Sequence, residues 1–104
     1  MGIVVFFAIL GFLFLSGLDV SAIPSDNLKV SFIDVGYGDS ILIQDETGFD
    51  VLIDGGSPLG GTKVIGYLQD QGVDEIDVMV ATHAHKDHIG GLTEILQQTD
   101  IPVH

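Results

Sequence analysis

The apolar positions of this chain fall into short runs that are separated by glycine-rich and acidic connections. Val, Ile, Leu and Phe dominate these runs, and this composition predicts strands. We expect strands at residues 28–34, 40–44, 49–54 and 76–82. Several of the runs carry apolar residues on both faces, which is typical of a sheet covered on each side. Residues 45–48, with the sequence Asp-Glu-Thr-Gly, predict a hairpin turn between the second and third runs.

A first helix is expected between the third and fourth strands. Val64, Ile65 and Leu68 share one helical face there. Thr62 is the expected N-cap and Gly72 the expected stop, because a Thr hydroxyl can accept from backbone amides and glycine tolerates left-handed backbone. The loop before this helix, from Ser57 to Gly61, is rich in glycine and contains one proline.

A second helix is expected over Ile89–Gln98, followed by the start of another strand at residues 101–103. Its predicted buried stripe consists of Ile89, Leu92, Ile95 and Leu96. Gly90 and Gly91 each cost a helix about 1 kcal/mol relative to alanine. Their missing side chains would allow either a close approach of the backbone to a ligand or close packing of the helix on a strand.

The first 22 residues have a different character from the rest. Ile3–Leu15 is almost wholly apolar, and residues 2–18 carry no charge. A helix that spans a bilayer needs about 20 apolar residues, so we expect a signal peptide, with cleavage after the small residues Val20-Ser21-Ala22. The usual basic amino-terminal region is missing, and a retained membrane anchor through residues 3–18 is the alternative. Either reading predicts an extracytoplasmic location, secreted or membrane-anchored, with residues 23–27 as a linker.

The length and composition of the chain indicate that residues 28–104 form one small domain or a part of one. The chain has 104 residues, of which 46% are hydrophobic, and its net charge is −12. That charge opposes strong binding of this segment alone to a phosphate backbone. Cysteine is absent, which excludes disulfides and thiolate metal ligands.

Three of the four histidines lie within six positions, directly after the fourth apolar run. His83 and His85 are two residues apart, so in extended backbone both imidazoles can face one point. Asp87 and His88 follow where the chain turns into the helix. Imidazole and carboxylate suit zinc, iron or manganese. We expect two divalent ions, one on His83 and His85 and the other on Asp87 and His88, sharing a bridging water that serves as the nucleophile of a hydrolysis.

A solvated, histidine-rich loop is the alternative interpretation, and the strand–loop–helix context disfavours it. The motif His83-x-His85-x-Asp87-His88, followed by Ile-Gly-Gly-Leu, resembles the HxHxDH signature of the metallo-β-lactamase superfamily. Residues 32–40 (FIDVGYGDS) and 51–56 (VLIDGG) resemble the branch that includes the hydrolase domain of the competence protein ComEC. The resemblance runs from Leu28 to the last residue. Many ComEC-type domains lack the second histidine of the motif, whereas His85 is present here.

This resemblance implies the N-terminal half of an αββα sandwich, a mixed sheet with helices packed on it, and a domain truncated at its C-terminus. The family's further metal ligands, two histidines and a bridging aspartate, would lie downstream. His104 does not stand where the family's third histidine lies, and we expect it to be a bystander. We also expect an incomplete metal site, an exposed sheet edge and an uncovered sheet face.

The resemblance also assigns roles to individual residues. The metal ions would be held by His83, His85, Asp87 and His88, with zinc expected and manganese or iron as alternatives. Asp87 would also act in catalysis by orienting the attacking water. Asp54 would orient the histidine loop through hydrogen bonds, the alternative being a turn carboxylate. The residues themselves favour a structural turn at Asp34, Gly36, Gly38 and Asp39, the alternative for the two aspartates being support of the histidine loop like that of Asp54.

The function implied is a metal-dependent hydrolase that acts on phosphodiester or nucleic-acid substrates through a metal-bridging hydroxide. A lactamase or lactonase with a small-molecule substrate is one alternative, and a non-catalytic secreted binding module is another. The intact histidine motif disfavours the binding module. Lys86 could contact a substrate anion, although a solvated loop lysine is the favoured reading. We expect this segment alone to be inactive.

Overall fold

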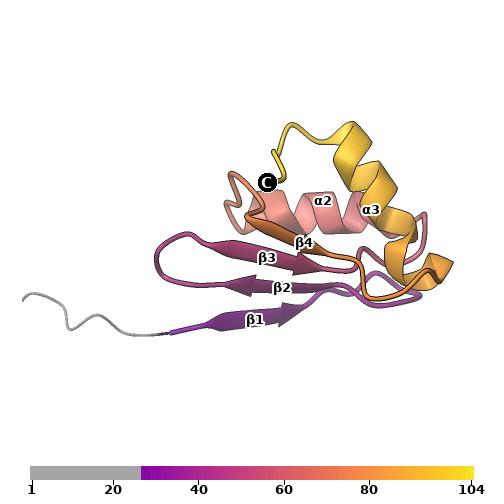
Figure 1. Cartoon of the computed structure of the whole chain (residues 1–104), viewed down its shortest axis with the longest axis horizontal. Coiled ribbons are helices and arrows are strands. Elements are labelled where there is room, and N and C mark those ends of the chain that lie inside the picture. The colour runs from indigo at the N-terminus through magenta and orange to yellow at the C-terminus, as the bar shows by residue number, and fades with distance from the viewer. Residues whose placement is uncertain (1–26) are drawn as a thin grey trace, which may run out of the picture.

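The computed structural model describes residues 27–104, which form a mixed four-stranded sheet with two helices on one face (Figure 1). The expected signal peptide or membrane anchor, residues 1–22, lies outside the described residues, as does the linker up to residue 26. Within residues 27–104, no helix has the length and apolar character that crossing a membrane requires.

The strands follow one another across the sheet in chain order. They are β1 (Lys29–Phe32), β2 (Ile41–Gln44), β3 (Asp50–Ile53) and β4 (Val78–Val80). β1 and β2 pair antiparallel, as do β2 and β3, whereas β3 and β4 are parallel. The carboxyl ends of β1, β3 and β4 therefore meet at the same end of the sheet (Figure 1). All four expected strands are confirmed, and each is shorter than its apolar run.

The hairpin between β2 and β3 is built on one carboxylate. Asp45 Oδ1 accepts hydrogen bonds from Thr47 N, Thr47 Oγ1 and Phe49 N at 2.8, 2.7 and 2.9 Å. These donors favour the charged form and outweigh desolvation, so the pKa of Asp45 lies below its usual value. Gly48 takes the left-handed conformation (φ 88°) that closes the turn.

The first helix, α2 (Gly61–Asp70), ends as expected and begins differently. Gly72 has a φ of 70°, and its amide donates to Gln69 O, which satisfies a carbonyl at the helix end. Thr62 is not the N-cap: that position is Gly60, which makes no side-chain cap bond. The Thr62 hydroxyl instead donates to Glu94 Oε1 of the second helix at 2.9 Å. The Thr62 hydroxyl therefore forms a contact between the two helices instead of capping the backbone amides of α2.

The second helix, α3 (Lys86–Gln98), begins three residues before the expected Ile89. Its N-cap is His85, in extended conformation, and the His85 carbonyl accepts from the amides of His88 and Ile89, both at 3.0 Å. Asp87 therefore lies in the first turn, where a carboxylate interacts favourably with the helix dipole. The predicted stripe is correct for Leu92 and Ile95, but Leu96 is 59% exposed.

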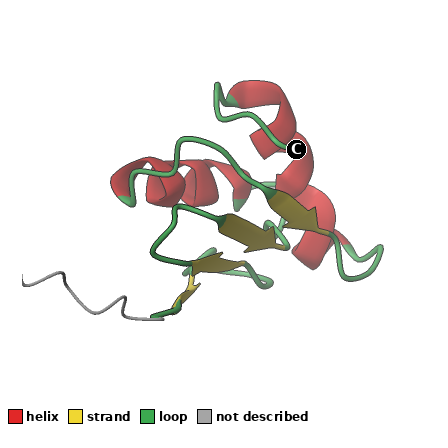
Figure 2. Ribbon diagram, turned by 60° about the vertical axis from the view of Figure 1, so that its left-hand side comes forward, coloured by secondary structure: helices red, strands yellow, loops and turns green. Residues whose placement is uncertain are grey.

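Both helices cover the same face of the sheet (Figures 1 and 2). From the sheet, Leu42 and Leu52 point into the core and are fully buried. They pack in one cluster with Val64 and Leu68 of α2 and Ile95 of α3. The isolated parallel bridge between Ile76 and Val103 places the expected strand start, residues 101–103, beside the segment that leads into β4.

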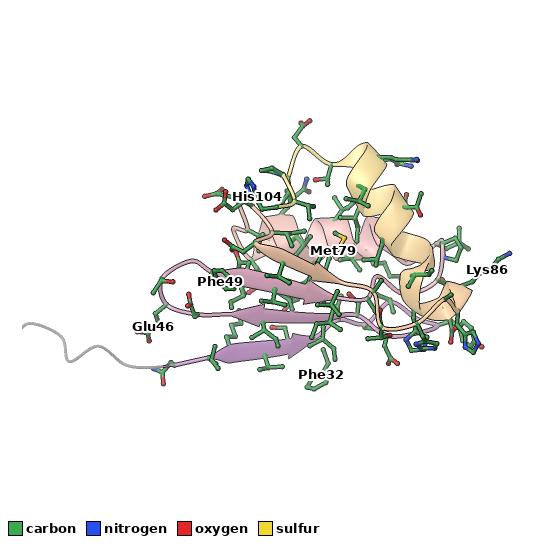
Figure 3. All side chains as sticks on the ribbon, in the orientation of Figure 1. Phe32, Glu46, Phe49, Met79, Lys86 and His104 are labelled. Atoms are coloured by element: carbon green, nitrogen blue, oxygen red, sulfur yellow. The ribbon has the colours of Figure 1, made fainter. Side chains whose placement is uncertain are left out.

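The other face of the sheet is apolar and is not covered by any described residue. The register pairs its residues across all four strands, and they are Val30, Phe32, Ile41, Ile43, Val51, Ile53, Val78 and Val80. Phe32 is 80% exposed and projects away from the helices (Figure 3). The apolar pattern on both faces was read correctly, and the expected uncovered face is confirmed for the described residues.

Candidate metal centre

Three loops meet at the end of the sheet where β1, β3 and β4 finish. They follow those strands at residues 33–40, 54–60 and 81–85 (Figure 1). Backbone hydrogen bonds join the first two loops to each other and to the start of α3. Gly56 N donates to Asp39 O at 2.9 Å, Asp39 N to Asp87 O at 3.2 Å, and Gly55 N to His88 O at 2.7 Å. The first turn of α3 is therefore held directly against two of the loops.

Glycines make this close approach possible. A Cβ atom added at Gly38 would overlap the carbonyl oxygen of Asp87, and one added at Gly91 would overlap the carbonyl oxygen of Gly55. A Cβ at Gly90 would meet Pro58. Of the two roles considered for Gly90 and Gly91, the structure shows close packing, against the loop after β3 rather than against a strand.

Asp54 lies at the centre of the three loops. It is buried, and its φ of 58° is the only positive value among non-glycine residues in the described part of the chain. Its amide donates to Val80 O at 2.8 Å, and its carbonyl accepts from the Ser40 hydroxyl at 2.9 Å. These backbone bonds fix the direction of the carboxylate.

The Asp54 carboxylate binds the loop after β4, which carries His83 and His85. Oδ1 accepts from Thr82 N at 2.9 Å, and Oδ2 accepts from Thr82 Oγ1 at 2.6 Å. Oδ2 also lies 3.0 Å from His88 Nδ1. Burial alone would raise the pKa of Asp54, but the hydrogen bonds from Thr82 and the contact with His88 outweigh it, and the pKa is lowered. The carboxylate is therefore ionised at neutral pH.

These contacts determine which ring nitrogen of His88 and His83 is free. An ionised carboxylate only accepts, so His88 Nδ1 must carry the proton that faces Asp54. The Thr82 hydroxyl donates its one hydrogen to Asp54 and lies 2.9 Å from His83 Nδ1, so His83 Nδ1 must donate to that hydroxyl. In a neutral imidazole, a proton on Nδ1 leaves the lone pair on Nε2, the form in which imidazole binds metals.

The three imidazoles of the motif gather beside this network. The ring centroids of His83 and His88 are 4.1 Å apart, and those of His83 and His85 are 4.7 Å apart. Asp87 Oδ2 lies 3.6 Å from His88 Nε2. Imidazole nitrogens and a carboxylate match the donors that divalent metals such as zinc prefer. In residues 27–104, however, no group of three or more His, Cys, Asp or Glu side chains is arranged to hold one ion.

The remaining candidates occupy distinct places. Asp34 Oδ1 accepts from Gly36 N at 3.0 Å, inside the loop after β1. Asp39 ties that loop down through its backbone, while its carboxylate is 71% exposed and lies 3.7 Å from His88 Nδ1. His104 pairs with Glu75 at 3.3 Å, at the opposite end of the molecule from Lys86 (Figure 3).

Thr82 was not recognised from the sequence as part of the site. The apolar pattern assigns Thr82 only to the end of a strand, yet its one hydroxyl connects Asp54 to His83. Its position immediately before the first histidine was the available signal, because a hydroxyl next to a ligand can hydrogen-bond that ligand's other nitrogen.

Comparison with known proteins shows similarity to one protein superfamily and to hydrolases. A family model described as the metallo-β-lactamase superfamily matches residues 33–104. The probable metallo-hydrolase YqgX of Bacillus subtilis is 41% identical over 44 residues, which are 42% of this chain and 20% of YqgX. Ribonuclease J 1 of Streptococcus pyogenes serotype M3 is 42% identical over 38 residues, 36% of this chain and 7% of that protein.

Among solved structures, the metallo-β-lactamase SMB-1 bound to 2-mercaptoethanesulfonate superposes with a TM-score of 0.59. The superposition covers 71% of this chain and 29% of SMB-1, at 22% sequence identity. At that identity the likeness shows the fold alone. The mixed sheet and its two helices match one part of the SMB-1 fold, and the chain spans only about a fifth of YqgX.

Proposed function

Because the chain belongs to the metallo-β-lactamase superfamily, we propose that it supplies part of the metal centre of a metal-dependent hydrolase. The observation that carries this proposal is the pair of Nε2 atoms that Asp54 and Thr82 leave free on His88 and His83. A divalent metal supplies a Lewis acid and lowers the pKa of water so that it can attack near neutral pH. Zinc is the proposed ion, with manganese or iron as alternatives.

The residues of this chain would divide between two ions. His83 and His85 lie on the same loop and would hold the first, while Asp87 and His88, in the first turn of α3, would hold the second. Asp87 would also orient the attacking water, because its carboxylate lies on the His88 Nε2 side of that ring. Further ligands would come from the parent protein outside the described residues, since no three-ligand group is present within them.

The proposed substrate is a phosphodiester, and specifically a nucleic acid. Support comes from the similarity to ribonuclease J 1 and from the ComEC-like sequences around Asp34 and Asp54. The net charge of −12 means that metal ions, or basic residues elsewhere, would have to hold the phosphates. Extracytoplasmic action, with residues 1–22 as a signal peptide or anchor, belongs to the same proposal.

The experiment uses the full-length protein that contains this chain, loaded with zinc or manganese. Bound metal is measured by atomic emission, and hydrolysis is measured on single-stranded DNA, a chromogenic phosphodiester and a β-lactam. His83→Ala should lose bound metal and activity, whereas the matched control His104→Ala should keep both. Hydrolysis of the lactam alone would favour the small-molecule alternative. A protein that binds no metal and is unaffected by His83→Ala would refute the hydrolase proposal.

A further inference from the structure

The loop after β1, whose backbone contacts the first turn of α3, carries one exposed aromatic side chain. Tyr37 is 74% exposed, and it stands between Gly36 and Gly38, whose φ angles are 83° and 97°. The next residue but one, Asp39, has its carboxylate 3.7 Å from His88 Nδ1. Gly38 packs directly on the backbone of Asp87. The phenol ring therefore projects from a segment that contacts the residues proposed as metal ligands.

The backbone that carries this ring is held at several points. Asp34 Oδ1 accepts from Gly36 N at 3.0 Å, and Tyr37 O accepts from Ser57 N at 3.2 Å. Asp39 donates its amide to Asp87 O and accepts at its carbonyl from Gly56 N. A loop fixed in this way before and after Tyr37 loses little conformational entropy when the ring makes a new contact.

Nothing in the described structure uses the ring. Among residues 27–104, Tyr37 stacks on no other ring, and its hydroxyl makes no hydrogen bond to another side chain. An exposed tyrosine on a fixed loop is a suitable surface for a planar ligand, because its face can be covered by stacking while the hydroxyl remains in water.

The charge of the chain favours stacking over phosphate contacts as a source of affinity. Only three basic residues are present against 15 acidic ones, and one of the three, Lys29 at the start of β1, is bonded to Gln71. Base–aromatic stacking does not depend on net charge and tolerates any base. We propose that Tyr37 is a substrate-contacting residue that stacks on a nucleobase next to the phosphodiester to be cleaved. This proposal rests on the hydrolase function proposed above.

The test compares two oligomers in the full-length, metal-loaded protein. One is a decathymidylate, and the other has the same length and backbone but abasic sites throughout. Tyr37→Ala should raise the KM for the decathymidylate about ten- to a hundredfold and leave the KM for the abasic oligomer unchanged. Tyr37→Phe keeps the ring and should stay within about twofold of the wild type. Phe49→Ala, an exposed aromatic at the hairpin far from the loop (Figure 3), is the matched control and should change neither KM.

Tyrosine fluorescence separates this proposal from the hydrolase function. The decathymidylate should quench the wild-type emission, and the part of the quenching that is due to Tyr37 should disappear in Tyr37→Phe. Such quenching without cleavage would support the stacking contact while contradicting the hydrolase proposal. Three results would overturn the role of Tyr37. They are an unchanged KM for the decathymidylate in Tyr37→Ala, an equal rise in KM for both oligomers, and no quenching of tyrosine fluorescence by the decathymidylate.

Discussion

The hydroxyl oxygen of Thr82 lies 2.6 Å from Asp54 Oδ2 and 2.9 Å from His83 Nδ1. One buried carboxylate thereby acts on two imidazoles, on His88 directly and on His83 through the hydroxyl. Asp54 is held in its unusual backbone conformation by two hydrogen bonds, one that its amide donates to Val80 O and one that its carbonyl accepts from the Ser40 hydroxyl. A substitution at Thr82 should therefore change how well His83 binds a metal ion.

Replacing Thr82 by valine removes the hydroxyl and keeps the shape of the side chain. The Asp54 carboxylate loses one donor, and His83 Nδ1 loses the acceptor that holds its proton, so we expect metal affinity to fall about ten- to a hundredfold. The metal-free protein should lose about 1–3 kcal/mol of unfolding free energy. Metal titration and urea denaturation measure the two effects. Thr82→Ser is the control and should restore most of both, whereas an unchanged metal affinity in Thr82→Val would contradict the hydroxyl's role.

Replacing Asp54 by asparagine should change how stability depends on pH. The folded pKa of Asp54 is lowered from its ordinary value of 3.8, so its ionised form stabilises the fold above that pH. This contribution is lost as the pH falls through the lower folded pKa. Asparagine tolerates the same left-handed backbone, and the variant should be less stable by about 2 kcal/mol near pH 7, where it lacks hydrogen bonds to a charged acceptor.

Urea denaturation with a chelator present, from pH 7 down to pH 2, measures this difference without a contribution from bound metal. The difference in unfolding free energy between wild type and Asp54→Asn should be constant from pH 7 down to about pH 4 and should become smaller at lower pH. Asp74→Asn, an exposed carboxylate before β4, is the matched control. A gap that grew on acidification would show that the sign assigned to Asp54 is wrong.

Two glycine-to-alanine substitutions in the helices should have opposite effects. A Cβ at Gly91 would overlap Gly55 O, so Gly91→Ala must push α3 away from the loop after β3 and should cost about 2 kcal/mol or more. A Cβ at Gly66, in α2, meets nothing within 4 Å, and Gly66→Ala should stabilise the protein by about 0.5–1 kcal/mol. Thermal unfolding of the two variants distinguishes them. Equal effects would show that the contact of α3 with the loop is not tight.

The sequence predicted those parts of the structure that depend on local pattern. The apolar runs located all four strands, and Gly72 marked the end of α2 because no other residue adopts its conformation as readily. The spacing of the histidines predicted that the imidazoles of His83 and His85 face one point, and in the structure the His83 ring lies 4.7 Å from that of His85 and 4.1 Å from that of His88; their role as metal ligands stays a prediction.

The parts that were missed depend on contacts between distant segments. Thr62 has the composition of an N-cap but bonds to Glu94, which lies 32 residues away in the chain. The early start of α3 has a similar cause, since Asp39 and Gly55 bind the carbonyls of its first turn. The family resemblance implied that Asp54 hydrogen-bonds to the histidine loop, but it did not identify Thr82, 28 positions away in the chain, as the partner.

The uncovered sheet face leads to the last prediction. Phe32 is the most exposed of the eight apolar residues on this face. Burial of such a side chain against another surface is favourable by roughly 1.5–3 kcal/mol. The 104-residue chain should therefore bind a hydrophobic dye and self-associate through this face as its concentration rises. Phe32→Ser should weaken both, with little change in the thermal midpoint, because the side chain contributes little to the folded core. Leu59→Ser is the matched control, since Leu59 is 88% exposed on the loop before α2, away from the sheet face. Dye fluorescence and sedimentation velocity measure the outcome, and equal effects of the two substitutions would show that the sheet face is not the surface responsible.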